Sequence, residues 1–362
     1  MKQILLISLN QFGYEVGYPY YAKYLNEKFD VKYICRDKKL PKYNISNLEV
    51  LYIKTQSAIL IYFKLIKYIL KIKKENKIEL VFCRNFALGF LVKLLFINKP
   101  VVYDIHTATI SDNKFKKGFR DLILRINIAF FSYVTVLSES LRKELKISKK
   151  KAHILPLGGE FQYLKEKNKK RLNLLYVGSL SNRNIEETIE GLSLFLDQNE
   201  QFKELIRYII IGHGDKSSIE KIHNTIDLHD LSKNVSYIGK LYHEKLIPFF
   251  ESANIGISYI PQKKYYECQP PTKTFEYFLA GLAVIATNTY ENRLVVNIKN
   301  GVIIEDNSLA FSLGLEKIAL NLESYNFESI AKDSKKFSWR NIINSNLIPY
   351  IDSIIIANNK FH

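Results

Sequence analysis

The stretch PPTKTFEYFLAGLAVIATN, residues 270–288, decides the fold of this 362-residue chain. Pro270 and Pro271 disfavour helix, so a helix of about nine residues is predicted to begin near Thr272. Gly281 then ends that helix as a glycine at the C′ position. The apolar run LAVIAT follows at once and predicts a buried strand. A helix that leads directly into a buried strand is the repeating unit of a parallel α/β sheet.

The same alternation of short apolar runs and longer amphipathic stretches fills the rest of the chain. Strands are predicted at residues 2–8, 31–35, 48–53, 79–84, 100–106, 132–138 and 152–158, and, after the polar stretch 161–172, at 173–179, 207–214, 234–240, 253–260, 282–288 and 300–306. This rhythm predicts two consecutive Rossmann-like, doubly wound domains with right-handed crossovers. The length agrees, because a domain takes roughly 100–200 residues. Ligands of such sheets bind at the carboxyl ends of the strands.

Composition excludes several classes of protein. With 47% hydrophobic and 25% charged residues, the chain is neither disordered nor collagen-like. Cys35, Cys83 and Cys268 are too few and too scattered for a disulfide framework or a zinc ribbon, and they fit a reducing compartment. The N-terminal segment runs directly into a strand and is expected to be core rather than a secretion signal. Lysines interrupt the two most apolar stretches, 57–70 and 86–97, so neither is expected to span a membrane.

The net charge of +17 is unevenly distributed, since residues 1–160 carry +16 and the remainder +1. Such asymmetry predicts an anionic partner for the first half. The helical stretch 64–77 puts Lys64, Lys67, Lys71 and Lys74 opposite Leu65, Ile66, Ile69 and Ile72. A basic helix of this kind can lie on anionic lipid. A lysine-rich composition would also produce basic surfaces, but the near-neutral second half argues against it as the whole explanation.

Several residues at predicted strand ends are candidates for binding. Glu276 falls early in its helix, where a carboxylate can accept two sugar hydroxyls, although the helix dipole also favours a solvated glutamate there. Gly178 lets the backbone approach a ligand, and a helix beginning near Ile185 directs its N–H groups at an anion. Arg183 adds a bidentate charge, or is a surface arginine that caps a loop. Gly212 and Gly214 form a glycine turn after a strand, a weak signal by itself.

In the first half, His106 ends the predicted strand 100–106, where it would face the ligand edge; a structural histidine is the alternative. Asp104 would share its strand face. The opening loop at 10–21 contains Gly13 and four tyrosines. Those tyrosines, Tyr14, Tyr18, Tyr20 and Tyr21, are candidates for stacking on a sugar, with Tyr20 and Tyr21 rather expected in the core.

Residues 270–288 closely resemble the signature of the group 1 retaining glycosyltransferases, which have two Rossmann-like domains, the GT-B fold. The resemblance continues in order through residues 100–106, 153–160, 176–192, 209–215, 234–258 and 337–356. It implies an α/β protein with two Rossmann-like doubly wound domains facing across a cleft, and a C-terminal helix that crosses back to the first. The expected parts are an acceptor-binding domain at 1–162, a linker at 163–172, a nucleotide-sugar-binding domain at 173–336 and the terminal helix at 337–362. Trp339 is either the anchor of that crossover or an ordinary core aromatic.

The resemblance also implies roles for individual residues. The catalytic candidates are His106, Glu276 and Arg183, with Glu276 holding the ribose hydroxyls of the donor. The donor-binding candidates are Gly13, Gly178, Ser179, Arg183, Gly212, Gly214, Ile238, Lys273, Thr274 and Glu276. Two positions depart from the family pattern. Cys268, next to Glu267, stands where many members have a glutamate directed at the donor sugar, and Ser179 stands where members often have an arginine.

The expected function is therefore that of a retaining, hexosyl-type glycosyltransferase that uses a nucleotide-diphosphate sugar as its donor, with no cofactor. No Asp-x-Asp pair occurs, so no metal is expected. The expected acceptor is a glycan or a lipid-linked molecule of surface polysaccharide or glycolipid synthesis, such as capsule or lipopolysaccharide. The expected location is cytoplasmic, peripherally bound to the anionic inner face of the plasma membrane. A catalytically inactive GT-B scaffold remains an alternative; a nucleic-acid-binding protein would share the charge, but no such motif is found.

Overall fold

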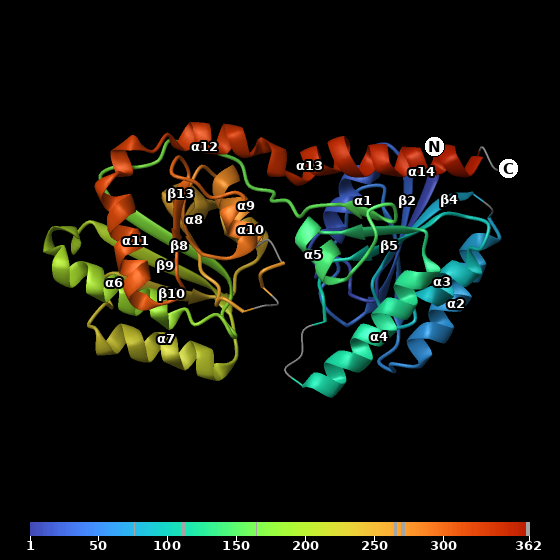
Figure 1. The fold of residues 1–362 in the computed structure, drawn as a ribbon, viewed down its shortest axis with the longest axis horizontal. Coiled ribbons are helices and arrows are strands. Elements are labelled where there is room, and N and C mark those ends of the chain that lie inside the picture. Colours follow the sequence, from blue (N-terminus) through green and yellow to red (C-terminus); the bar gives the residue numbers. More distant parts are fainter. Residues whose placement is uncertain (76, 110–112, 164, 264–265, 269–271, 360–362) are drawn as a thin grey trace. The chain divides into compact units, whose positions relative to one another are not determined.

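The computed structural model describes residues 1–75, 77–109, 113–163, 165–263, 266–268 and 272–359. It divides into two compact units (Figure 1). Unit 1 comprises Met1–Leu157 together with Trp339–His362, and unit 2 comprises Gly158–Ser338. Pro270 and Pro271, on which the predicted helix start partly rested, lie outside the described residues.

Unit 1 is built on a parallel seven-stranded sheet in the order β3-β2-β1-β4-β5-β6-β7. The strands are β1 (Gln3–Ile7), β2 (Asp30–Asp37), β3 (Glu49–Lys54), β4 (Ile78–Arg84), β5 (Val101–Ile105), β6 (Tyr133–Val136) and β7 (Ala152–Ile154). Every residue of β1 and β5 is buried, because helices cover both faces of the sheet. The seven strands predicted for the first half are confirmed, with shifts only at their ends.

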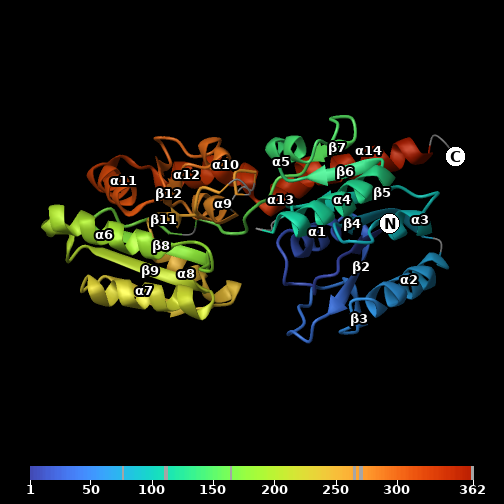
Figure 2. The same cartoon turned by 60° about the horizontal axis from the view of Figure 1, so that its bottom comes forward.

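The helices of unit 1 are α1 (Tyr18–Leu25), α2 (Leu60–Lys73), α3 (Phe90–Leu95), α4 (Lys114–Phe130) and α5 (Glu139–Glu144). Consecutive helices α2, α3 and α4 pack side by side in one layer, which both cartoon views show (Figures 1 and 2). No helix in the described part of the chain is both long enough and apolar enough to cross a bilayer.

The end of the chain packs on unit 1, as expected. It consists of α13 (Trp339–Ile342), a π-helical segment (Ile343–Leu347) and α14 (Ile348–Asn359), which contact α1 and β4. The Trp339 ring is buried and stacks on Tyr20, with centroids 5.1 Å apart, while Tyr21 meets it edge-on. Trp339 therefore fastens the returning chain to α1.

Unit 2 is built on a parallel six-stranded sheet in the order β10-β9-β8-β11-β12-β13. The strands are β8 (Leu172–Ser179), β9 (Ile206–His213), β10 (Val235–Gly239), β11 (Ile255–Ser258), β12 (Ala283–Thr287) and β13 (Gly301–Ile304). The main helices are α6 (Glu186–Gln198), α7 (Lys216–Leu228), α8 (Ile247–Ser252), α9 (Thr272–Leu279), α10 (Tyr290–Arg293), α11 (Ser308–Leu320) and α12 (Phe327–Ser334). The six predicted strands of the second half are all present. The stretch expected to be a linker is grouped with this unit, where the Lys167 ammonium donates to the carbonyl of Phe250.

The decisive stretch folds as predicted into α9 followed by β12. Gly281 ends the helix with φ +74°, and its N–H donates to the Phe278 carbonyl. The N–H of Leu282 then donates to the Tyr277 carbonyl, so the last turn is closed by a C-terminal cap. A Cβ at Gly281 would overlap the Tyr163 ring, which adds a packing reason for glycine. This cap fixes α9 against the sheet that it helps to cover.

Candidate functional site

Three glycines bring the ends of β8 and β9 unusually close together in unit 2. Gly178 and Gly212 lie opposite one another in the sheet, and a Cβ on Gly212 would overlap the Gly178 carbonyl oxygen. A Cβ on Gly214 would lie 2.8 Å from that of Leu180. Gly178 also adopts φ +157°, and any side chain there would press on the Lys273 amine. These glycines therefore keep the backbone bare at the carboxyl end of the sheet.

The Lys273 side chain ends in a buried amine beside this bare backbone. Its Nζ lies 3.9 Å from the centroid of the Tyr176 ring and has no hydrogen-bond partner among the described residues. Burial holds the pKa of Lys273 well below its usual range, the charge of Arg183 lowers it further, and Glu276 opposes both. A buried amine without an acceptor is costly. An anion bound at this point would supply the missing acceptor.

Arg183 lies in the loop between β8 and α6. Its guanidinium stacks on the Tyr266 ring, 4.4 Å from the centroid, and donates a hydrogen bond to the Tyr266 hydroxyl. Asn182 and Asn184 on either side have positive φ, so the loop is a tight turn just before the start of α6. The Ser179 carbonyl accepts a hydrogen bond from the Tyr176 hydroxyl. The loop thus holds one cation near the N-terminus of α6, where backbone N–H groups favour negative charge.

Glu276 follows Lys273 by three residues in α9, so the two side chains emerge on neighbouring positions of one helix face. Burial raises the pKa of Glu276 to about 7, the charge of Lys273 opposes this, and Glu160 raises it further. Near neutral pH this carboxyl can therefore both accept and donate hydrogen bonds.

The other predicted residues of unit 2 differ in what their side chains do. The Thr274 hydroxyl is buried and shares hydrogen bonds with Ser258 and Asn292, so it ties α9 to β11. Ile238 lies at the end of β10, 42% exposed. Glu267 accepts a hydrogen bond from the Tyr290 N–H at 2.7 Å, at the start of α10. One oxygen of the Glu267 carboxylate is therefore already bound to the backbone of unit 2.

Unit 1 carries a second candidate site around His106, at the end of β5. His106 Nε2 lies 2.7 Å from an oxygen of the buried Asp104 carboxylate, and Arg84 Nη1 lies 3.0 Å from Nδ1. A guanidinium can only donate, so Nδ1 is the acceptor and the ring proton is on Nε2. The other Asp104 oxygen accepts the Thr135 hydroxyl at 2.6 Å. Arg84 thus hydrogen bonds to one side of the imidazole, and the Asp104 carboxylate lies close to the other side without hydrogen-bond geometry.

Two residues of this cluster, Arg84 and Glu15, were missed by the sequence analysis. Glu15 accepts a hydrogen bond from the Tyr33 hydroxyl and forms an ion pair with Arg84 at 3.0 Å, and its side chain is only 3% exposed. The signal for Arg84 was available: it ends a buried strand that pairs with β5, in register with Asp104. Gly13, in the same opening loop, has φ +90° and packs so closely on Tyr43 that a Cβ would overlap that ring.

The tyrosines of the opening loop are mostly used inside unit 1. Tyr18 and Tyr21 are fully buried, which removes Tyr18 as a sugar-stacking residue and agrees with the core position expected for Tyr21. Tyr20 stacks on Trp339. Tyr14 is half-buried, and its hydroxyl donates to the Pro41 carbonyl.

Comparisons with known proteins agree with this architecture. Residues 171–320 match the model of the family described as glycosyl transferases group 1. A search of curated proteins found no match. Among solved structures, sucrose-phosphate synthase of Thermosynechococcus elongatus superimposes with a TM-score of 0.73 and 14% identity, over 99% of this chain and 100% of the other. HepE of Anabaena, in complex with UDP, gives 0.71 and 14%, over 98% and 100%.

The lipopolysaccharide outer core galactosyltransferase WaaB, in its apo form, gives a TM-score of 0.65 with 13% identity, over 96% of this chain and 99% of the other. At these identities the structural likeness establishes the fold, which is GT-B. The match at 171–320 covers the part of unit 2 that carries the glycine turn, Arg183 and the Lys273–Glu276 helix. Residues 171–320 thus match the group 1 glycosyltransferase family, and the chain as a whole has the GT-B fold.

Proposed function

We propose that this protein transfers a sugar from a nucleotide-diphosphate sugar to an acceptor with retention of anomeric configuration and without a metal ion. The observation that carries the proposal is the buried Lys273 amine, which lacks a hydrogen-bond acceptor among the described residues and lies against the bare backbone of Gly178. A phosphate group is an acceptor of the right charge for that position. HepE, a structure of similar fold, was solved with UDP bound.

In this proposal the donor diphosphate lies between Lys273, Arg183 and the first N–H groups of α6. These groups are fixed before the reaction, so they stabilise negative charge on the leaving diphosphate as the sugar departs. Glu276 accepts the ribose hydroxyls of the nucleotide. The donor also approaches the exposed backbone at Gly178, Ser179, Gly212 and Gly214. Thr274 and Ile238 are uncharged and support the site without contacting the diphosphate as cations do.

Unit 1 is proposed to take the acceptor, with His106 at the reacting end of the donor sugar. The hydrogen bond from Arg84 orients the imidazole beside the Asp104 carboxylate, and a fixed orientation is what a group that positions a sugar requires. The acceptor is a glycan or lipid-linked sugar of surface polysaccharide or glycolipid synthesis, and the enzyme works at the inner face of the plasma membrane. The charge of +16 on residues 1–160 supports this placement, because the membrane there is anionic.

A thermal-shift screen against UDP-, GDP-, ADP- and CMP-sugars identifies the donor, since a ligand that binds the folded state raises its stability. With that donor, Glu276→Ala and Arg183→Ala are expected to weaken donor binding or turnover about tenfold or more. His106→Ala is expected to lose transfer while keeping donor binding. Chelation with EDTA should leave the rate unchanged, and NMR of the product should show the anomeric configuration of the donor. Unchanged transfer in both unit 2 variants would contradict the site.

A GT-B scaffold without transfer activity is the second candidate, and two observations favour it. Cys268 occupies the position where many members of the family have a sugar-binding glutamate, and the neighbouring Glu267 is hydrogen bonded to the backbone of α10. Hydrolysis or transfer from any nucleotide sugar by the purified protein eliminates this candidate. If donor binds but no sugar is ever released, the scaffold is the better description.

A further inference from the structure

Helix α4 of unit 1 carries a continuous apolar stripe that is largely exposed, and only its last member, Phe130, is seen to pack against another described ring, that of Phe90. Phe115, Phe119, Leu122, Ile126 and Phe130 follow one another at spacings of three or four residues, which puts them on one helix face. Their exposed fractions are 93, 66, 55, 45 and 44% in that order. A run of large apolar side chains left in water is unusual in a folded protein and marks an interaction surface.

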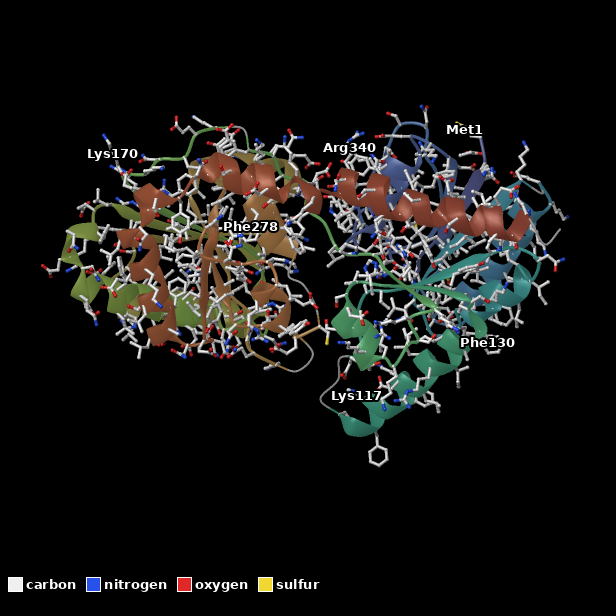
Figure 3. All side chains as sticks on the ribbon, turned by 45° about the horizontal axis from the view of Figure 1, so that its top comes forward. Met1, Lys117, Phe130, Lys170, Phe278 and Arg340 are labelled. Atoms are coloured by element: carbon white, nitrogen blue, oxygen red, sulfur yellow. The ribbon has the colours of Figure 1, made fainter. Side chains whose placement is uncertain are left out.

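The opposite face of α4 already accounts for the packing of the helix on its unit. Among the described side chains of α4, only Leu124 and Asn127 are buried, and Asn127 hydrogen bonds to the backbone of Ala87 and Phe90. The Lys117 end of the helix projects beyond the rest of unit 1, whereas the Phe130 end lies against it (Figure 3). The apolar face is therefore presented outward and is most exposed at the projecting end.

The charges on α4 define what the stripe can contact. The helix has five basic residues and one acidic one, and that acid, Asp121, is paired with Lys117 at 2.9 Å. Lys116 and Arg125 flank the stripe on its two sides, at one residue's rotation from Phe115 and Ile126. A second copy of this helix would bring like charges together, which opposes self-association through this face. An anionic surface with an apolar interior matches both features.

The same character continues on α2, which lies in the same layer. Leu60, Phe63 and Leu70 are exposed there among Lys64, Lys67 and Lys71, and the helix contains no acidic residue. The side that the α2 helix turns inward consists of Ile61, Leu65, Ile69 and Ile72. Basic and apolar side chains thus extend across the layer rather than being confined to one helix.

We propose that α4 is the element that inserts into an anionic lipid bilayer, with its apolar stripe entering the acyl boundary and the basic residues of α4 and α2 contacting the head groups. This membrane contact would hold unit 1 where a lipid-linked acceptor is found, and only that purpose rests on the proposed function. The basic stretch 64–77, expected from the sequence to lie on lipid, falls largely on α2, and the basic residues Lys114, Lys116, Lys117 and Arg120 fall on α4. In this proposal α4 inserts and α2 contributes electrostatic attraction.

The test is co-sedimentation of the full chain with vesicles of phosphatidylcholine alone and of phosphatidylcholine mixed with phosphatidylglycerol. We expect binding to the mixed vesicles that Phe115→Ser/Phe119→Ser weakens about tenfold or more. The matched control, Leu228→Ser/Leu320→Ser, removes two comparably exposed apolar residues from unit 2 and should bind as the parent does. Lys116→Glu should bind at least about fivefold more weakly, whereas Lys299→Glu in unit 2 should not.

Equal binding to neutral and anionic vesicles, or equal loss in the control pair, would overturn the inference. So would a dimer, detected by light scattering, that Phe115→Ser/Phe119→Ser dissociates, because the stripe would then belong to a second copy. The thermal shift induced by the donor found in the nucleotide-sugar screen should be the same in all four variants. The two proposals fail separately: a parent protein that binds no nucleotide sugar contradicts the proposed function, and vesicle binding that ignores α4 contradicts this one.

Discussion

Glu276 is a carboxyl whose burial has a consequence for stability. Its pKa is raised from the ordinary 4.5 to about 7, first by burial and then by Glu160, against the charge of Lys273. A raised folded-state pKa means that this group stabilises the fold below about pH 4.5, and that the contribution is lost as pH rises to about 7. Glu276→Gln removes the titration. We expect the variant to match the parent at pH 4.5 and to exceed it at pH 8 by about 2 kcal/mol, less than full burial would give because the side chain is only half-buried.

Urea unfolding at both pH values measures this difference. Glu204→Gln, a change at an exposed carboxyl of the same unit, is the control and should leave the pH profile unchanged. Parallel profiles for the parent protein and Glu276→Gln would contradict the assigned environment of Glu276.

At Lys273, one substitution is expected to raise stability and to weaken nucleotide binding. Its amine is buried without a hydrogen-bond acceptor among the described residues, so Lys273→Met should remove a desolvation cost and raise the free energy of unfolding by about 1–2 kcal/mol. The same change removes a charge-assisted contact to the donor diphosphate, so the thermal shift induced by the donor found in the nucleotide-sugar screen should shrink. One thermal-melting series with and without that donor measures both the stability and the shift. A variant that is more stable and keeps the full shift would show that Lys273 does not contact the nucleotide.

For individual residues, the sequence could predict which side chains lie close together within one helix or strand. It could not predict side-chain contacts between different elements. The spacing of Lys273 and Glu276 sets their common helix face, and strand ends indicate Gly178 and His106. The stacking of Arg183 on Tyr266 joins two loops 83 residues apart, and no periodicity encodes it. The ion pair of Glu15 with Arg84 likewise needs the register of the folded sheet and the turn at Gly13.

The pairing of β8 with β9 depends on glycine in a way that can be measured. At Gly212 a Cβ would overlap backbone, which cannot move without opening the sheet, so Gly212→Ala should cost about 3 kcal/mol or more. Gly239 ends β10 with φ +86° but has nothing within 4 Å of a Cβ, so Gly239→Ala should cost only about 1 kcal/mol of backbone strain. Urea midpoints of the two variants compare them directly. Equal losses would mean that φ, and not the close approach of β8 and β9, determines the need for glycine.

The strands were the most predictable elements, because both faces of a parallel sheet are covered and each strand is a continuous apolar run. For the helix of residues 64–77, three of the four residues predicted on the inner face, Leu65, Ile69 and Ile72, are buried. The structure also buries Ile61. The stripe on α4 was not recognised, since an apolar face at helical spacing normally predicts packing against the core. The π-helical segment at Ile343–Leu347 has no counterpart in the pattern either.

For the whole molecule, unit 1 is discontinuous in sequence, and hydrophobic periodicity alone cannot show this. A pattern indicates that residues 337–356 form helix, but not which sheet the helix covers. The resemblance to a family supplied that expectation, and the contact of Trp339 with Tyr20 and Tyr21 gives its physical cause. Truncation after Ser338 should therefore expose the core of unit 1 rather than remove an independent tail.

The position of Trp339 allows the two units to be followed separately. It is the only tryptophan in the chain and is buried in unit 1, whereas every residue proposed to contact the nucleotide apart from Gly13 lies in unit 2. The donor found in the nucleotide-sugar screen, at about 100 times its Kd, adds about 2.7 kcal/mol to the unfolding free energy of the part that binds it. If the units unfold independently, the circular dichroism transition of unit 2 should move to higher urea while the tryptophan fluorescence midpoint stays in place. A fluorescence midpoint that moves by the same amount would show that the ligand stabilises both units as one cooperative structure.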